Sequence, residues 1–165
     1  MQLDTIISIK KEVIKALLEK LSEALSLAER QLEQARQGAI EAPGRMQSRY
    51  DSAKQEFSYL AESYQKRIFQ IKNEISTLEE WKVRQTSKEI VDVGSLVETE
   101  EDRNKKKSFY FILPAGAGEI VKNRRLRKTI TIISVKSPLA KELLNKRVGD
   151  SLVIASRKLT ITCLH

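Results

Sequence analysis

Cysteine and histidine are almost absent from this sequence, and their scarcity excludes several kinds of site. The 165 residues include one cysteine, Cys163, and one histidine, His165. A single cysteine cannot form an internal disulfide, so we expect a reducing, cytoplasmic setting. With one histidine, at the last position, no Ser/His/Asp or Cys/His triad can be assembled, and these two residues supply too few ligands for a zinc site. We therefore expect no metal centre and no enzymatic activity of the chain's own.

Long apolar runs are also missing. Charged side chains between Asp4 and Glu12 interrupt the first turns, so we expect neither a signal peptide nor a membrane span. Aromatic residues make up 5% of the chain and charged residues 32%, with a net charge of +8. Residues 89–165 hold 15 Lys/Arg against 9 Asp/Glu, whereas residues 1–88 hold 15 against 13. The basic surplus of the C-terminal part favours acidic partners, either nucleic acid or an acidic protein surface.

Two segments repeat apolar residues at the alternating spacings of three and four that are typical of coiled coils. The first seam consists of Ile14, Leu18, Leu21, Leu25, Ala28, Leu32 and Ala35, which Ile7 extends backwards. The second consists of Tyr50, Ala53, Phe57, Leu60, Tyr64, Ile68, Ile71, Ile75 and Leu78. A short break that Gly38 opens lies between them, at residues 38–49. The pattern predicts helices over 5–37 and 50–82 that pair as one antiparallel hairpin, a domain of residues 1–84 with its tip at about 38–49.

After Trp81 the pattern becomes that of a small β-domain, residues 89–165. Strand-like segments occur at residues 91–97, 109–113, 129–135, 152–155 and 159–164. Residues 98–108 carry charges of both signs, and we interpret them as a solvated hairpin loop. Ser137 is a suitable N-cap with Pro138 at the first helical position, which predicts a short helix to Leu144. The predicted fold class is α+β, a coiled-coil hairpin followed by a small antiparallel sheet with one short helix.

The C-terminal part carries a resemblance to a known family. The segment from Val135 to Val153 resembles the C-terminal signature of the Gre transcription elongation factors, in which Ser-Pro opens a short helix and Gly-Asp precedes a strand. Asn145 stands where that pattern usually has glycine. The segment from Tyr110 to Glu119 resembles a variant found in Gre-like proteins that are not the standard cleavage factors. The resemblance implies a C-terminal domain similar to the FKBP fold.

The resemblance also implies a partner, bacterial RNA polymerase. In Gre factors the globular domain docks at the mouth of the secondary channel and the coiled coil reaches the active centre. Two acidic tip residues there help to hold a second Mg²⁺, with which the polymerase cleaves its own backtracked transcript. The residues that we expect to dock on polymerase are Ser137, Pro138, Leu139, Lys141, Lys146, Gly149 and Asp150.

The tip of the hairpin departs from the family pattern, which has two acids three residues apart. Aligning Tyr50 with the family's tyrosine places those acids on Pro43 and Met46, and aligning Arg67-Ile68 with the family's Arg-Ile places them on Gln47 and Tyr50. Neither alignment restores the pair. The candidates for contact with the active centre are Glu41, Arg45, Arg49, Tyr50 and Asp51. The two acids among them either share a metal across the neck of the hairpin, or Asp51 complements the dipole of the second helix while Glu41 is solvated.

A basic cluster precedes the strand expected at 129–135. It consists of Lys122, Arg124, Arg125, Arg127 and Lys128. The cluster is either a contact for nascent RNA, DNA or an acidic polymerase surface, or simply a solvated hairpin.

Three functional interpretations remain open. The resemblance favours a monomeric Gre-like regulator that enters the secondary channel, with altered or absent stimulation of cleavage. It brings no cofactor of its own, and the alternative is an Mg²⁺ shared at the polymerase active centre. The second interpretation is a coiled-coil interaction adaptor that does not act on polymerase. The third is a prolyl isomerase, which the aromatic content does not favour, because the C-terminal part has one consecutive aromatic run at residues 109–111.

Overall fold

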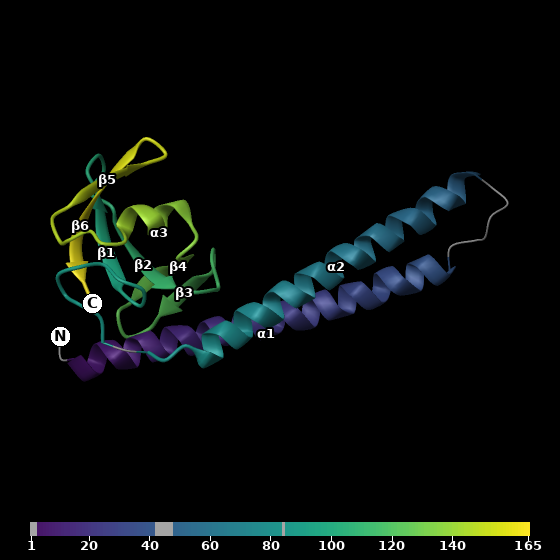
Figure 1. Ribbon diagram of the computed structural model, residues 1–165, viewed down its shortest axis with the longest axis horizontal. Helices are drawn as coiled ribbons and strands as arrows, with labels where there is room; N and C mark the ends of the chain where they lie inside the picture. Colours follow the sequence, from purple (N-terminus) through teal and green to yellow (C-terminus); the bar gives the residue numbers. More distant parts are fainter. Residues whose placement is uncertain (1–2, 42–47, 84) are drawn as a thin grey trace. The chain divides into compact units, whose positions relative to one another are not determined.

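The computed structural model describes residues 3–41, 48–83 and 85–165, with side chains everywhere in these ranges except at residues 3–4 and 48–52. The helices and strands (Figure 1) are, in chain order, α1 (Leu3–Glu41), α2 (Ser48–Glu80), β1 (Leu96–Glu101), β2 (Lys107–Leu113), β3 (Ile120–Asn123), β4 (Lys128–Ser134), α3 (Pro138–Leu143), β5 (Ser151–Ile154) and β6 (Arg157–Leu164). The α+β fold class predicted from the sequence is therefore confirmed.

The contacts of the chain divide it into two compact units. Residues 19–76 form one unit, called here the hairpin unit, and residues 1–18 with 77–165 form the other, called the C-terminal unit. The first turns of α1 thus belong with the sheet. The division into domains 1–84 and 89–165 stays a prediction. In the described residues no helix is long and apolar enough to cross a membrane.

In the hairpin unit α1 and α2 lie side by side and antiparallel. Leu21, Ala28, Ala35 and Ile71 of the predicted seams are buried. Lys72 pairs with Glu29 at 3.1 Å between Nζ and Oε1, while near the far end Gly38 lies against Phe57. A later position on α1 thus contacts an earlier position on α2. The two helices are therefore antiparallel, which confirms the predicted hairpin within this unit.

Gly38 is not part of the break between the helices, and that prediction was wrong. It lies inside α1, which continues to Glu41. A Cβ atom at this position would stand 2.7 Å from Cε1 of Phe57, closer than real Cβ contacts come. The glycine therefore allows close packing of the two helices. The reversal of the chain falls outside the described residues.

The six strands of the C-terminal unit form one sheet in the order β3-β4-β2-β1-β6-β5. Neighbouring strands are antiparallel, as predicted, except that β2 and β4 run parallel with Phe111 opposite Ile132. The short edge strand β3 was not predicted, because its four residues, Ile-Val-Lys-Asn, are too few to show a clear period. Ala140 and Leu143 of α3 belong to the buried cluster that covers the sheet, together with Val97 and Ile112.

The charged stretch at residues 98–108 contains a hairpin turn, as predicted, but the turn is confined to residues 102–106 and both ends of the stretch are strand. β1 extends to Glu101 and β2 begins at Lys107. Charges are tolerated in β1 because alternate side chains point to opposite faces of a sheet, so that Thr99 is buried while Glu98 is not. Lys107 Nζ lies 2.8 Å from Glu98 Oε1 and neutralises it on the outer face.

The first turns of α1 pack within the C-terminal unit. Ile6, Ile9, Val13 and Leu17 are buried there, and none of these four residues belongs to the predicted heptad seam. Gly116 lies so close that a Cβ on it would stand 2.8 Å from Leu17 Cδ2, and its φ is +79°. This part of α1 therefore uses a different face from the part in the hairpin unit.

Candidate functional site

The predicted docking segment, residues 137–150, begins with a capped helix. The side-chain oxygen of Ser137 accepts a hydrogen bond from the Ala140 amide at 3.2 Å, and Pro138 occupies the first turn. Both features are typical of a helix start. The buried Ala140 and Leu143 then fix one face of α3 against the core, so that the other face is free to meet a partner.

The end of the segment is tied to the chain that precedes the sheet. Asn145 has φ +65°, a left-handed conformation that asparagine tolerates better than most residues, which explains how it replaces a glycine. Its amide donates to the Val91 carbonyl at 2.9 Å, and the Val91 amide donates to the Lys146 carbonyl at 2.8 Å. The Arg147 amide donates to Oδ2 of Asp150 at 2.7 Å. Asp150 therefore stabilises the turn of residues 147–150, and it is also exposed.

Four of the seven predicted docking residues are exposed and three are half-buried. The exposed residues are Pro138, Lys141, Gly149 and Asp150, and the half-buried ones are Ser137, Leu139 and Lys146. Sequence reasoning missed two neighbouring apolar side chains, Val148 and Val153, which are 46% and 66% exposed. The signal was present in the alternation of β5, where Leu152 points inward and Val153 outward.

The predicted tip residues are only partly described. Glu41 is the exposed last residue of α1, and its Oε1 accepts a hydrogen bond from Gln37 Nε2 at 2.6 Å. Arg49, Tyr50 and Asp51 lie in the first turn of α2, with side chains outside the description, and Arg45 lies outside the described residues altogether. Their roles stay predictions. Among the described residues no group of three His, Cys, Asp or Glu could hold a metal ion.

A buried lysine lies where the first turns of α1 meet the end of the sheet. Lys10 is only 2% exposed, and its Nζ donates to Oγ1 of Thr86 at 2.9 Å. Thr86 in turn donates to the carbonyl of His165 at 3.3 Å. These residues line a small cavity with Ile6, Ile7, Gln85 and Lys88.

Burial changes the ionisation of this group of residues. It lowers the pKa of Lys10 to about 8, because the charged ammonium loses its hydration. Burial also lowers the pKa of His165; the negative charge of Glu98 opposes this shift, and the positive charge of Lys10 adds to it. At neutral pH the histidine is therefore mainly neutral beside a charged lysine.

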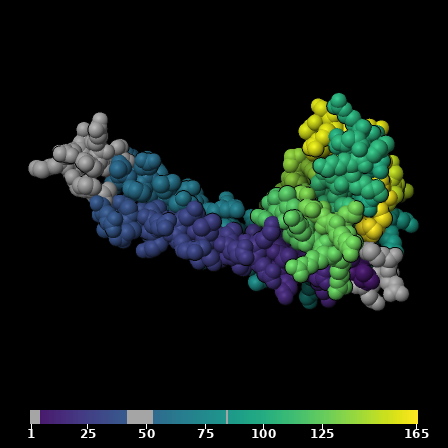
Figure 2. Space-filling view, turned by 180° about the vertical axis from the view of Figure 1, so that it is seen from behind, coloured from purple at the N-terminus to yellow at the C-terminus, as the bar shows by residue number. Residues whose placement is uncertain are grey.

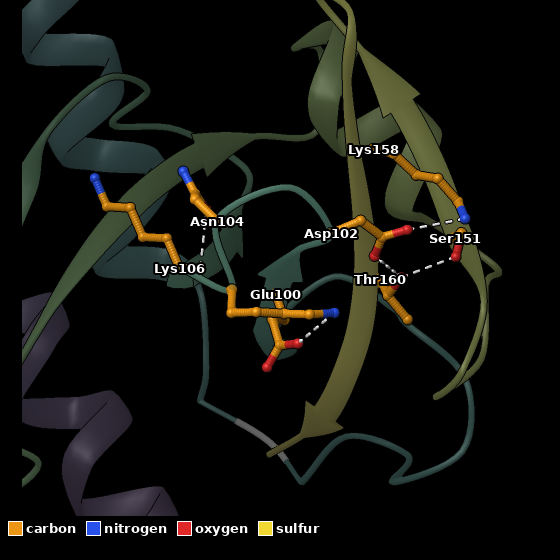
Figure 3. A network of polar contacts seen from close by, with 8 residues as sticks. Glu100, Asp102, Asn104, Lys106, Ser151, Lys158 and Thr160 are labelled. Carbon is orange, nitrogen blue, oxygen red and sulfur yellow. Dashed lines mark hydrogen bonds and ion pairs between the residues drawn. The ribbon is translucent and has the colours of Figure 1, made fainter.

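A polar network connects the β1–β2 turn with β5 and β6 (Figure 3). Asp102 Oδ2 lies 2.9 Å from Lys158 Nζ, and Oγ1 of Thr160 donates to Asp102 Oδ1 at 3.0 Å. Ser151 and Thr160 share a hydrogen bond of 2.9 Å. The hydrogen bonds from Lys158 and Thr160 hold the pKa of Asp102 below its ordinary value. On this part of the surface lysine charge is therefore compensated.

Residues 86–163 match the family described as "Transcription elongation factor, GreA/GreB, C-term". This part of the chain is similar to the C-terminal domain of the GreA/GreB factors. The match contains every predicted docking residue and none of the tip residues. The Gre-like resemblance of the sequence is thereby confirmed for residues 86–163, which contain the one short helix and all but the last residue of the six-stranded sheet.

Solved structures of GreA/GreB proteins and their homologues are similar to parts of this chain that include residues of the C-terminal domain. GreA factor homolog 1 (Gfh1) of Thermus thermophilus is 22% identical, with 90% of this chain and 94% of that one covered and a TM-score of 0.39. Gfh1 of Thermus aquaticus is 23% identical, with coverages of 92% and 95% and a TM-score of 0.38. GreA/GreB from Nitrosomonas europaea is 14% identical, with coverages of 67% and 91% and a TM-score of 0.35. No match was found among curated protein sequences. The family assignment rests on residues 86–163.

Proposed function

We propose that this protein is a Gre-like transcription regulator that binds bacterial RNA polymerase and inserts its coiled-coil hairpin into the secondary channel. The observation that carries the proposal is the GreA/GreB match of residues 86–163, in a chain whose other half is a pair of long helices. α1 has 39 residues, and at 1.5 Å per residue such a helix is roughly 58 Å long. A helix pair of this length supports a role in reaching into a deep channel.

Docking is assigned in this proposal to the C-terminal domain. Its capped helix α3 exposes Lys141, the turn to Asp150 exposes the apolar Val148 next to Arg147, and β5 exposes Val153. Exposed apolar side chains next to a charged residue are what a protein interface needs, with an apolar centre and a polar rim. The docked protein acts as a monomer and contributes no enzymatic activity.

Stimulation of transcript cleavage is altered or absent in this proposal. The Gre acids fall on Pro43 and Met46, or on Gln47 and Tyr50, and none of these side chains carries a carboxylate for a hard cation. No step of the proposal therefore passes through a metal held by this chain. Any Mg²⁺ at the site belongs to the polymerase.

Purified core polymerase tests the proposal directly. Fluorescently labelled protein should bind core polymerase, and it should compete with a cleavage-stimulating Gre factor for the enzyme. In a backtracked complex with labelled RNA, it should slow cleavage by that factor while adding little cleavage itself. If no binding to polymerase is detected at micromolar concentrations, the proposal is wrong.

A coiled-coil adaptor is the second candidate, and exposed apolar residues on the hairpin unit favour it. Leu27, Ile40, Tyr59 and Phe69 are 50%, 76%, 64% and 68% exposed. Such side chains suit a helical partner that covers the outside of the hairpin. Light scattering distinguishes the candidates: an adaptor of this kind forms a dimer or captures a helical partner without polymerase, whereas the Gre-like regulator is monomeric.

A further inference from the structure

The β3–β4 hairpin concentrates positive charge at one edge of the sheet. The residues are Lys122, Arg124, Arg125, Arg127 and Lys128, and all five are exposed. β3 is the edge strand and pairs only with β4 within the sheet. In the space-filling view the hairpin, in green, adjoins the first turns of α1, in purple (Figure 2). The question is which of these charges are available to a partner.

Two of the five cations are engaged within the chain. Arg125 Nε lies 2.8 Å from Glu12 Oε1, and its Nη1 donates to Ser8 Oγ at 3.2 Å. Lys128 Nζ lies 5.7 Å from the centre of the Phe109 ring, within the range of a cation–π contact. Lys122, Arg124 and Arg127 remain, and none of the three forms an ion pair with any residue in the described part of the chain. They are the charges that a partner can neutralise.

Lysines elsewhere on the sheet are paired. Lys105 lies 3.4 Å from Glu100, Lys107 lies 2.8 Å from Glu98, and Lys158 lies 2.9 Å from Asp102. Within the described residues these three side chains are compensated by acids, whereas Lys122, Arg124 and Arg127 are not. Replacing these three lysines supplies a matched control. It lowers the net charge by the same amount as replacing Lys122, Arg124 and Arg127, but at positions where acids already compensate the lysines.

The turn that carries the free arginines is held in place. Asn123 is 5% exposed, and its Oδ1 accepts from the Leu126 amide at 2.9 Å. Its Nδ2 donates to Glu12 Oε2 at 3.4 Å, and Arg127 adopts φ +51°. A turn that is already ordered loses less conformational entropy when it binds.

The composition of the surface points to phosphate groups. A protein interface has an apolar or aromatic centre, whereas this hairpin offers three cations around the half-buried Leu126, with Ile120 half exposed on β3. Phe109 is buried, so no aromatic ring is presented there for base stacking. We propose that Lys122, Arg124 and Arg127 bind the phosphate backbone of nucleic acid, RNA or DNA, without reading its sequence.

Fluorescence anisotropy with the full-length protein tests this inference in the absence of polymerase. The probes are a labelled 20-nucleotide RNA and a labelled DNA duplex of mixed sequence, titrated between 50 and 300 mM KCl. Neutralising three phosphates predicts a slope of log K against log [salt] of roughly −2.7 for the duplex and roughly −2.1 for the single strand. The triple variant Lys122→Gln, Arg124→Gln, Arg127→Gln should bind at least tenfold more weakly at 50 mM KCl, with a slope flatter by about 2.

The matched control is the triple variant Lys105→Gln, Lys107→Gln, Lys158→Gln, which should bind within twofold of the unaltered protein. Circular dichroism checks that both variants are folded. Equal weakening by the two triple variants would mean that net charge alone attracts the nucleic acid, and would overturn the inference. The inference would also be overturned if the triple variant of the β3–β4 hairpin kept its affinity for nucleic acid but lost affinity for polymerase. The β3–β4 hairpin would then bind an acidic protein surface. Because the anisotropy assay contains no polymerase, its outcome is independent of the proposed docking.

Discussion

At the scale of single residues, Lys10 is buried although its neighbours in sequence suggest an exposed position. It lies in the charged start of the chain, yet it is 2% exposed and donates to Thr86, 76 positions away. A contact over that distance depends on how the chain returns to α1, which no local pattern records. The seam residues Leu21 and Ile71, in contrast, were predictable from spacing, because a heptad repeat identifies the face that is buried.

The lowered pKa of Lys10 predicts that stability increases with pH. Its folded-state pKa is about 8 and the ordinary value is 10.5. Between these values the unfolded chain binds more protons, so the free energy of unfolding rises as pH increases, by at most roughly 3 kcal/mol. Urea unfolding of the unaltered protein between pH 7 and 10.5 should show this rise. Lys10→Met should remove it, while Lys11→Met, at an exposed neighbour, should keep it. An unchanged rise in the Lys10→Met variant would contradict the assignment.

At the scale of elements, patterns with many repeats were reliable and short charged segments were not. The hairpin, β2, β4 and α3 were predicted within a few residues, since each has a clear period or a capping signal. β3 was missed because four residues show no clear period, and the outer part of β1 was missed because charge was taken as a sign of a loop. Each of these strands has one solvated face, on which lysine and glutamate are compatible with sheet pairing.

Gly38 offers a prediction at this scale, because two effects oppose each other there. Gly38→Ala should gain up to about 1 kcal/mol from helix propensity. The new methyl group would meet Phe57 at 2.7 Å, and overpacking of this kind costs about 1–3 kcal/mol. We therefore expect a net loss of stability in thermal unfolding followed at 222 nm. Adding Phe57→Leu should recover most of the loss. If Gly38→Ala alone stabilises the protein, the close packing is not a constraint.

The docking segment gives a second prediction for an element. Lys141→Glu combined with Val148→Asp changes two exposed side chains next to α3, so the fold should be kept. Affinity for core polymerase should fall at least tenfold, because the substitutions place acid in the centre and at the rim of the proposed interface. Lys105→Glu with Arg103→Gln, which makes the same net charge change on the β1–β2 turn, is the control and should leave the affinity within twofold. Equal loss in both variants would show that docking depends on overall charge and not on this segment.

At the scale of the whole molecule, a GreA/GreB-like C-terminal part follows two helices whose tip departs from the Gre pattern. The GreA/GreB match begins at residue 86, after the helices, and the tip lacks the expected acids and contains Arg45 and Arg49 in addition. Two positive charges brought near the catalytic carboxylates of the polymerase, or near the triphosphate of an incoming nucleotide, would perturb Mg²⁺ or substrate binding by charge alone. The protein should therefore occupy the secondary channel and inhibit transcript elongation, whereas a cleavage factor restarts backtracked complexes.

The last prediction concerns the two arginines at the tip, Arg45 and Arg49. Arg45→Ala with Arg49→Ala should keep the affinity for polymerase, since docking is assigned to the C-terminal domain, and should lose any inhibition of single-nucleotide addition. Arg36→Ala with Arg67→Ala removes two exposed arginines from the shafts of α1 and α2 and should leave the inhibition unchanged. Both variants are measured by quench-flow extension of a labelled transcript. Strong cleavage of a backtracked complex by the unaltered protein, abolished by Asp51→Asn or Glu41→Gln, would show instead that the acids at the neck of the hairpin replace the missing pair, and that the tip supports cleavage.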